Sequence, residues 1–185
     1  MQIAVYSGSF NPLHIGHLAI IRHMTEVEGF DFLYLIVSPK NPLKDTISSA
    51  SGQERYDAAV KALARHPYLN AKVDDIELNM PEPHYTIRTL DALREREPEN
   101  KFTLIIGADN LACIRSWRDY KRILREYGVC VFPRTGFDLS AIKSDLTEED
   151  PSYRITVSEA EMVDISSTII RKAIASGEEV SDWLM

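Results

Sequence analysis

The sequence predicts an α/β fold with a doubly wound, mostly parallel sheet, helices on both faces and a small C-terminal helical portion. Short apolar runs alternate with amphipathic segments along the chain, as they do when crossover helices join parallel strands. The runs at 32–38 and 102–107 are apolar nearly throughout, which is typical of strands covered on both faces. With 185 residues, we expect one domain spanning 1–185.

Strands are expected where apolar runs end at a turn-forming residue. The first run ends at Gly8, and two later runs end at Pro39 and Pro133, because proline cannot continue a ladder of hydrogen bonds. The four expected strands are 3–7, 32–38, 102–107 and 129–134.

Helices are expected where apolar residues recur at helical spacing and a stop residue follows. Pro67 and Pro98 follow two of these segments, and Gly128 and Gly177 end two others. The expected helices are 18–27, 52–66, 86–97, 117–128 and 165–177. The acidic stretch 138–152 has little pattern and is expected to be a mobile loop or a short helix.

Ligands of such sheets bind at the carboxyl ends of the strands. Right-handed crossovers place the loops that follow the strands at one edge, so the loops to inspect are 8–17, 39–51, 107–117 and 133–140.

Composition excludes several classes of protein. The chain has 21 basic and 28 acidic residues, a net charge of −7, which disfavours general binding of nucleic acid. No apolar run approaches the roughly 18 residues of a membrane span, and the N-terminus does not resemble a signal peptide. Two cysteines outside any CxxC pair suit a reducing compartment, so we expect a cytoplasmic protein.

The loop after the first strand, GSFNPLHIGH at 8–17, has the features of a phosphate site. Gly8 permits a sharp turn and a close approach of the backbone. His14 and His17 share a face at the start of a helix near Ile15, where unpaired N–H groups and the helix dipole favour anions. Zinc ligation lacks further ligands nearby, and the loop is neither a Walker loop nor GxGxxG.

A second capped helix start lies near the C-terminal end, in ISSTIIRKAIASG at 165–177. Ser166 and Ser167 are good N-caps. Arg171 follows Ser167 by about one turn, so both side chains can face one anion.

The first loop resembles the phosphate-binding signature of the nucleotidyltransferase superfamily, G-[ST]-F-[DN]-P-x-H-x-G-H, and ISSTIIR resembles its second signature, I-S-S-T-x-I-R. The resemblance implies a Rossmann-like fold that binds ATP. It assigns contacts with the ATP phosphates to the following residues: Gly8, Ser9, Phe10, His14, His17, Ser166, Ser167, Thr168 and Arg171.

Three further segments resemble the nicotinate mononucleotide adenylyltransferase family. IIGADNLACIRSW implies that Gly107 and Asp109 hold the nucleotide ribose and that Trp117 stacks on the pyridine ring. HYTIRTLDAL implies that Tyr85 and Thr86 line the nicotinate pocket, with backbone N–H groups near Thr86 and Arg118 meeting the carboxylate. The remaining acceptor-binding residues implied are Asn11 and Lys44; Leu43 stands where the family often has histidine.

The resemblance implies transfer of the adenylyl group of ATP to nicotinate mononucleotide, giving deamido-NAD and pyrophosphate, with His14, His17 and Arg171 as the catalytic residues. Mg²⁺ is expected with ATP, without a dedicated protein metal site. The alternatives are nicotinamide mononucleotide or another phosphate acceptor, and, more distantly, a non-catalytic nucleotide sensor. The expected partners are the two nucleotides, with neither nucleic acid nor membrane; a homo-oligomer stays open.

Overall fold

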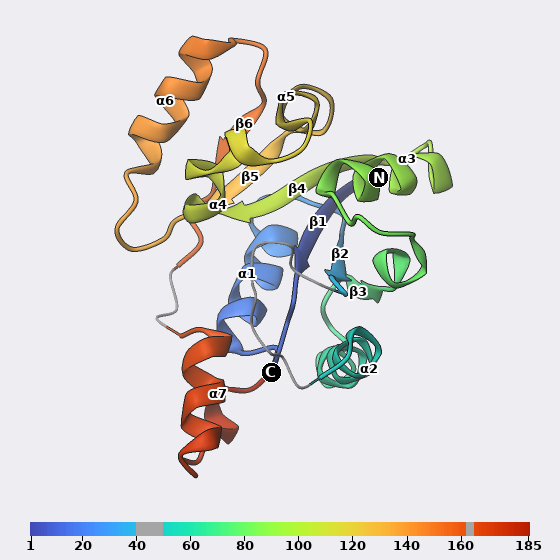
Figure 1. Ribbon diagram of the computed structural model, residues 1–185, viewed down its shortest axis with the longest axis vertical. Helices are drawn as coiled ribbons and strands as arrows, with labels where there is room; N and C mark the ends of the chain where they lie inside the picture. The colour runs from blue at the N-terminus through green and yellow to red at the C-terminus, as the bar shows by residue number, and fades with distance from the viewer. Residues whose placement is uncertain (40–49, 162–164) are drawn as a thin grey trace.

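A parallel sheet forms the centre of the computed structural model, which describes residues 1–39, 50–161 and 165–185 (Figure 1). Six strands in the described residues pair in the order β3-β2-β1-β4-β5-β6, and every neighbouring pair is parallel. The strands are β1 (Gln2–Gly8), β2 (Phe32–Val37), β3 (Ala71–Asp74), β4 (Lys101–Gly107), β5 (Val129–Phe132) and β6 (Ile155–Val157). This arrangement confirms the predicted fold class.

Helices cover both faces of the sheet because successive strand residues point to opposite sides. Ala4 and Tyr6 of β1 belong to a core with α1 (Ile15–Glu26) and α2 (Gly52–Leu63). Ile3 and Val5 belong to a second core with α3 (Thr86–Arg96), α4 (Ala108–Ala112) and α6 (Leu139–Glu149). Among the described residues, no helix is long and apolar enough to cross a bilayer.

Two strands, β3 and β6, are absent from the sequence prediction. They lie at the two ends of the sheet and are 4 and 3 residues long. Their sequences, AKVD and ITV, carry too few apolar residues for a buried run. Only pairing with β2 and β5 makes them strands.

The predicted helix 117–128 is wrong in its first part and in its geometry. Asp119 adopts a left-handed conformation, with φ of 52°, and this interrupts the chain after the 3-10 turn η2 (Ile114–Ser116). The helix starts as α5 (Tyr120–Arg122) and continues as the π-helical turn η3 (Ile123–Tyr127). It ends at Gly128, as predicted, with φ of 78°.

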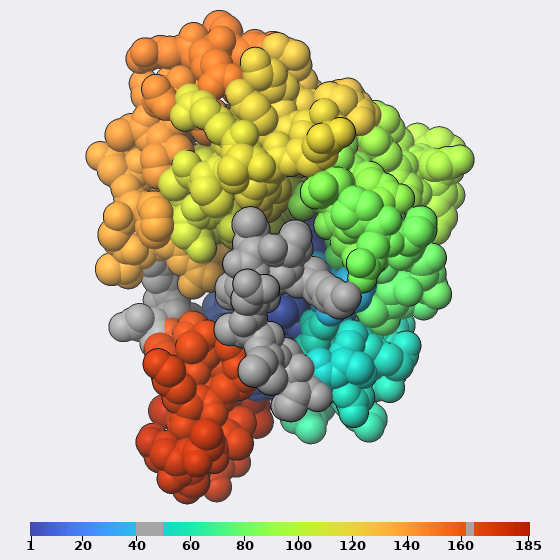
Figure 2. All heavy atoms as spheres, viewed as in Figure 1, coloured from blue at the N-terminus to red at the C-terminus, as the bar shows by residue number. Residues whose placement is uncertain are grey.

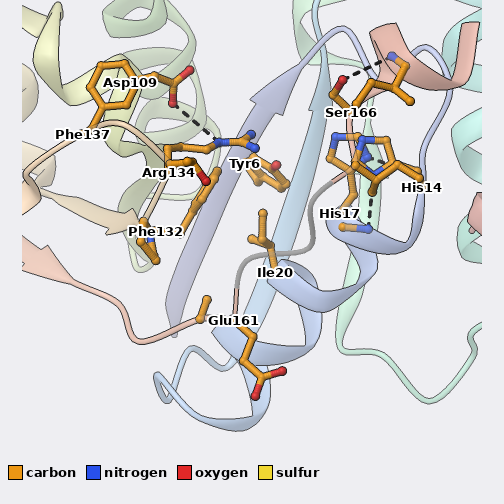
Figure 3. Close-up of a pocket in the computed structure, with 16 residues that line it drawn as sticks. Tyr6, His14, His17, Ile20, Asp109, Phe132, Arg134, Phe137, Glu161 and Ser166 are labelled. Carbon is orange, nitrogen blue, oxygen red and sulfur yellow. Dashed lines mark hydrogen bonds and ion pairs between the residues drawn. The ribbon is translucent and has the colours of Figure 1, made fainter. Parts of the chain in front are cut away.

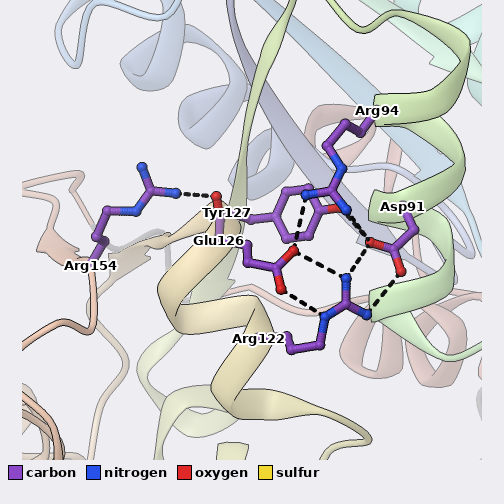
Figure 4. A network of polar contacts seen from close by, with 6 residues as sticks. All are labelled: Asp91, Arg94, Arg122, Glu126, Tyr127 and Arg154. Atoms are coloured by element: carbon purple, nitrogen blue, oxygen red, sulfur yellow. Dashed lines mark hydrogen bonds and ion pairs between the residues drawn. The ribbon is translucent and has the colours of Figure 1, made fainter.

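An ion-pair network ties η3 and α5 to α3 (Figure 4). Arg122 donates two hydrogen bonds to Asp91 of α3, at 3.1 and 3.0 Å, and also pairs with Glu126. Arg94 of α3 reaches Glu126 at 3.0 Å, and the Tyr127 hydroxyl donates to Asp91 at 2.5 Å. The irregular segment after β4 is therefore joined to a regular helix.

Most of the acidic stretch 138–152 forms a helix, α6 (Leu139–Glu149). The Asp138 side chain caps it by accepting from the Ala141 N–H at 3.0 Å, which satisfies a donor that the first turn leaves unpaired. Leu146 is buried in the core that also contains α3 and α4, and Leu139 and Ile142 pack partly buried against that core. A short η1 turn (Ile76–Asn79) precedes α3.

The C-terminal portion is helical, as predicted, and the structure shows that it has its own small core. It contains α7 (Ser167–Ala175) and η4 (Ser181–Trp183). Ile165, Ile170 and Val180 are buried together there, and Figure 2 shows this portion as a lobe at the foot of the molecule.

Candidate active site

A pocket of about 550 Å³ lies at the carboxyl edge of the sheet (Figure 3). It opens where the order of strands reverses, between β1 and β4, which is where doubly wound sheets bind ligands. Side chains from three regions far apart in sequence line it: the start of α1, the ends of β4 and β5, and the start of α7.

The loop that leaves β1 is shaped by Gly8 and Phe10. Phe10 has φ of 44°, and its ring packs edge-on against Tyr6 and His17, at centroid distances of 5.3 and 5.1 Å. A Cβ at position 8 would stand 3.1 Å from Phe10 Cζ. Glycine at position 8 therefore leaves room for the ring that supports His17.

The two histidines, His14 and His17, cap the start of α1 and stack on each other. His14 Nδ1 accepts from the Gly16 N–H, and His17 Nδ1 accepts from the His14 N–H, each at 3.2 Å. Their ring centroids are 3.7 Å apart. Because each Nδ1 is an acceptor, a neutral ring carries its proton on Nε2. Both side chains line the pocket as hydrogen-bond donors.

Both imidazoles stay neutral near pH 7. Burial lowers the pKa of His14 to about 4, and the nearby Arg134 charge acts in the same direction. Burial, His14 and Arg134 together hold the pKa of His17 well below its ordinary value. The pocket therefore holds two neutral donors and does not depend on imidazolium charge.

Replacing His14 with Gln is expected to reduce the decrease in the free energy of unfolding that occurs as pH is lowered. An unfolded histidine titrates near 6.5, whereas folded His14 stays neutral down to about 4. Between these values the unfolded chain binds more protons, so stability falls as pH decreases, by up to about 3 kcal/mol. Urea unfolding between about pH 7 and about pH 4.5 measures this slope.

His66→Gln is the matched control, because His66 bonds the Tyr68 hydroxyl at the surface. Its pH slope should follow that of the unsubstituted protein. If His14→Gln also keeps that slope, the folded protein does not disfavour the proton on His14.

The start of α7 lies against the loop after β1. The Ser167 hydroxyl donates to the Pro12 carbonyl at 3.0 Å, and Arg171 Nη1 donates to the Asn11 carbonyl at 2.7 Å. Arg171 Nη2 reaches the Thr168 hydroxyl at 3.2 Å, and Ser166 caps the helix through the Ile169 N–H at 3.3 Å. The two predicted phosphate motifs are thus in contact, through hydrogen bonds between residues 155 and 160 positions apart in the sequence.

The end of β4 contributes Gly107 and Asp109. A Cβ on Gly107 would stand 2.4 Å from Asp109 Oδ1, so glycine permits the carboxylate to lie over the strand end. Asp109 pairs with Arg134 at 3.7 Å, and the Arg134 guanidinium lies 5.0 Å from the centre of the Phe132 ring. Arg134 is a pocket residue that the sequence analysis did not select. Its position as the last residue of the expected strand 129–134, within the loop 133–140 marked for inspection, was the available signal.

Arg55 is a second residue that sequence reasoning missed. It is buried, and its guanidinium donates to the carbonyls of Ser9, Ser38 and Pro39 at 2.7–2.8 Å. It therefore fixes the loops that follow β1 and β2. A single arginine in a helix carries no sequence signal for this role.

None of the described acceptor-binding residues that the sequence predicts lines the pocket. Asn11 lies in the loop after β1, where its carbonyl accepts from Arg171, and the others lie on different elements. Tyr85 and Thr86 lie at the start of α3. The Arg118 guanidinium lies 6.0 Å from the centre of the Tyr85 ring, so the Trp117–Arg118 segment lies next to that start. Trp117 is half-buried against the core, and its indole N–H has no partner within the described ranges. The predicted Lys44 lies outside the described residues.

No group of three histidine, cysteine or acidic side chains suited to a metal ion is found in the part of the chain that the structure describes. The starts of α1 and α7 and Arg134 face the pocket and suit an anionic ligand, and two carboxylates, Asp109 and Glu161, also line it.

Comparison with known proteins gives consistent matches over the whole chain. The model of the cytidylyltransferase-like family matches residues 5–173. A protein of Flavobacterium johnsoniae named "probable nicotinate-nucleotide adenylyltransferase" is 37% identical over 184 residues, covering 100% of this chain and 92% of its own length. A Bacteroides fragilis protein of the same name is 37% identical, covering 99% and 87%.

The fold has a solved counterpart in the Plasmodium falciparum nicotinic acid mononucleotide adenylyltransferase complexed with NaAD. That structure matches with a TM-score of 0.79 at 18% identity, covering 99% of this chain and 90% of the other. The TM-score shows that the two proteins share a fold, and a sequence identity of 18% shows nothing beyond the fold.

Proposed function

This chain belongs to the nicotinate-nucleotide adenylyltransferase family, and we propose that it transfers the adenylyl group of ATP to nicotinate mononucleotide, giving deamido-NAD and pyrophosphate. One observation carries the proposal. The starts of α1 and α7 meet at a single pocket, at the point where the order of strands reverses. Two helix starts at such a point suit a chain of phosphates.

At the ATP end, His14 and His17 are proposed to donate Nε2–H to the triphosphate, and Arg171 to supply positive charge. Ser9 and Phe10 are proposed to contact the phosphates through their backbone, as are Ser166, Ser167 and Thr168, which form the start of α7. Gly107 and Asp109 are proposed to hold the ribose. Arg134, which lies over Phe132, adds a cation to this wall of the pocket.

In the proposed reaction, a phosphate oxygen of the acceptor attacks the α-phosphorus of ATP. The new P–O bond forms while the bond from the α-phosphorus to the bridging oxygen breaks, and pyrophosphate leaves with the electron pair. The acceptor phosphate, with a second pKa near 6, is mostly a dianion at neutral pH, so no protein base is required. Alignment of the two substrates supplies roughly 7–11 kcal/mol, and neutral histidine donors and Arg171 stabilise charge on the leaving group.

Mg²⁺ is proposed to enter with ATP as part of the substrate. Mg²⁺ keeps several waters and binds chiefly through substrate phosphates and one or two carboxylates. Asp109 is a carboxylate at the pocket, but its partner in the structure is Arg134. The protein groups then act on the phosphates directly.

At the acceptor end, Trp117 is proposed to stack on the pyridine ring, beside Tyr85 and Thr86, with Asn11 and Lys44 near the acceptor phosphate. The Arg118 side chain is 68% exposed and lies beside Tyr85. A cation at this position favours the carboxylate of nicotinate over the neutral amide of nicotinamide. This supports nicotinate mononucleotide as the preferred acceptor.

The test is pyrophosphate release with Mg-ATP and one of three acceptors at equal concentration: nicotinate mononucleotide, nicotinamide mononucleotide or phosphopantetheine. A preference for the nicotinate form of at least about tenfold in kcat/KM, which is 1.4 kcal/mol, supports the proposal. Equal use of both pyridine nucleotides keeps the chemistry and widens the substrate range. ATP binding without release from any acceptor indicates a nucleotide sensor instead.

Replacing Trp117 with Ala is expected to raise the KM for nicotinate mononucleotide about 5–10-fold and that for ATP less than about twofold. Loss of aromatic stacking removes about 0.5–1.5 kcal/mol beyond buried area, and only the acceptor would contact this ring. Steady-state kinetics with each substrate varied in turn measures both constants. Trp183→Phe, in the C-terminal core, is the control, and equal rises in both KM values would assign Trp117 to the core alone.

A further inference from the structure

The end of α6 contacts the segment that carries Trp117 and Arg118. Glu149 Oε2 accepts from Arg115 Nε at 2.8 Å, and its Oε1 accepts from the Tyr120 hydroxyl at 2.7 Å. Arg115 and Tyr120 stand on either side of Trp117 in the sequence. One carboxylate therefore holds both ends of a short segment, 115–120.

Glu149 is itself held to the body of the protein. Its Oε1 also accepts from the hydroxyl of Tyr153, a buried residue, at 2.9 Å. Asp145, one turn earlier on α6, accepts from Arg115 Nη2 at 2.9 Å. The acidic face of α6 is thus an anchor for the segment and not only a solvated surface.

Segment 115–120 has little regular backbone structure to fix it in place. The 3-10 turn η2 ends at Ser116, Asp119 is left-handed, and α5 begins only at Tyr120. Its backbone hydrogen bonds are local, from the N–H groups of Ser116, Trp117 and Tyr120 to carbonyls three residues earlier. Side-chain contacts therefore join the segment to the rest of the protein. On the far side, the Arg122–Asp91 pair joins the chain to α3 (Figure 4).

Position matters here because the two parts of the acceptor end come from different elements. Tyr85 belongs to the start of α3, whereas Arg118 comes from the anchored segment, 6.0 Å from the Tyr85 ring centre. The histidines and Arg171 are carried by α1 and α7. A shift of segment 115–120 would therefore change one end of the site and leave the other in place.

We infer that Glu149 is a positioning residue that holds the segment with Trp117 and Arg118, the latter beside Tyr85, and that it thereby sets the affinity for the acceptor nucleotide but not for ATP. The inference rests on the proposed function for the identity of the acceptor. It assigns a role to the acidic stretch that ends α6.

The anchor is charged at neutral pH. Hydrogen bonds from Arg115, then Tyr120 and Tyr153, lower the pKa of Glu149 to about 2. An isosteric Gln at this position removes the charge and turns one acceptor into a donor facing Arg115 or the tyrosines.

The test compares Glu149→Gln with Glu97→Gln in the full-length protein. Glu97 has matching partners, the Tyr34 hydroxyl, Arg96 and Asn100, and its side chain is 19% exposed against 26% for Glu149. Asn100 directly precedes β4, so Glu97 lies at the sheet edge opposite the pocket. This control makes the same chemical change far from the site.

Glu149→Gln is expected to raise the KM for nicotinate mononucleotide about 5-fold or more, with kcat and the KM for Mg-ATP changed less than about twofold. Glu97→Gln should leave all three values unchanged. Arg115→Gln should raise the acceptor KM as well. The double variant Glu149→Gln, Arg115→Gln should raise it by less than the product of the two single effects, because both changes break the shared Arg115–Glu149 contact.

A second measurement does not depend on activity. In a Trp183→Phe background, Trp117 is the remaining tryptophan, and acrylamide quenching of its fluorescence reports how firmly the segment is held. Quenching should increase with Glu149→Gln and not with Glu97→Gln.

The outcomes separate the inference from the proposed function. If the unsubstituted protein does not use nicotinate mononucleotide, the proposed function fails, and the quenching result still decides whether Glu149 anchors the segment. If the protein is active but Glu149→Gln matches Glu97→Gln in acceptor KM, the inference is overturned. Equal changes in both KM values and in kcat overturn it too, since they indicate general loss of structure.

Discussion

Replacing His17 with Ala is expected to lower kcat by about 10²–10³-fold in a protein that still folds, because a single hydrogen-bond donor aimed at developing charge contributes this much. His17 Nδ1 is occupied by the His14 N–H at 3.2 Å, so its Nε2–H is the group proposed to reach the leaving pyrophosphate. Pyrophosphate release at saturating substrates measures the loss.

Two further substitutions separate the cap of α1 from the catalytic role. In His17→Asn the side-chain oxygen can accept from the His14 N–H, but nothing replaces Nε2. In His17→Gln the side-chain amide reaches the Nε2 position. We expect Asn to be as inactive as Ala and Gln to recover part of kcat. His23→Ala, on the same helix and paired with Glu28 at 3.1 Å, is the control; full activity in His17→Asn would remove His17 from the mechanism.

Replacing Arg171 with Ala is expected to lower kcat/KM for ATP by about 10²-fold. The guanidinium binds the Asn11 carbonyl at 2.7 Å and is proposed to contact the phosphates as well, as a planar donor to two oxygens. Its loss removes one bond between α7 and the loop after β1 and the positive charge proposed to contact the phosphates. Initial rates over a range of Mg-ATP concentrations measure the effect.

Arg171→Lys keeps the charge but not the fork, so we expect it to recover only part of the loss. Lys172→Ala removes a neighbouring cation from the same helix and should retain full activity. If only the charge of Arg171 mattered, Arg171→Lys would have the same kcat/KM for ATP as the unsubstituted protein. A loss of kcat/KM in Lys172→Ala as large as that in Arg171→Ala would argue that α7 contributes only net charge.

Local pattern predicts most of the central strands and the long helices. The runs that became β2 and β4 are apolar nearly throughout, and proline or glycine marks where the elements end. The short strands β3 and β6 were not predicted, because 3 or 4 residues of mixed polarity form a strand only when they pair with a neighbouring strand. The left-handed conformation of Asp119 was not predicted either, since aspartate tolerates but does not require that conformation.

The candidate site divides in the same way. His14, His17 and Gly8 lie within one ten-residue loop, so their mutual geometry follows from a strand, a turn and a helix start that the sequence itself indicates. Arg134 and Arg55 carry no such pattern, because each acts on partners distant in the chain.

By itself the sequence determined the central strands, most of the long helices and the two capped helix starts, because capping, turn formation and apolar periodicity depend on residues a few positions apart. Tertiary structure alone decided that Arg171 meets Asn11 and that Glu149 holds Arg115 and Tyr120. It also decided that both histidines are neutral. Contacts between residues 29 to 160 positions apart, and the burial that shifts a pKa, arise only when folding brings distant segments together.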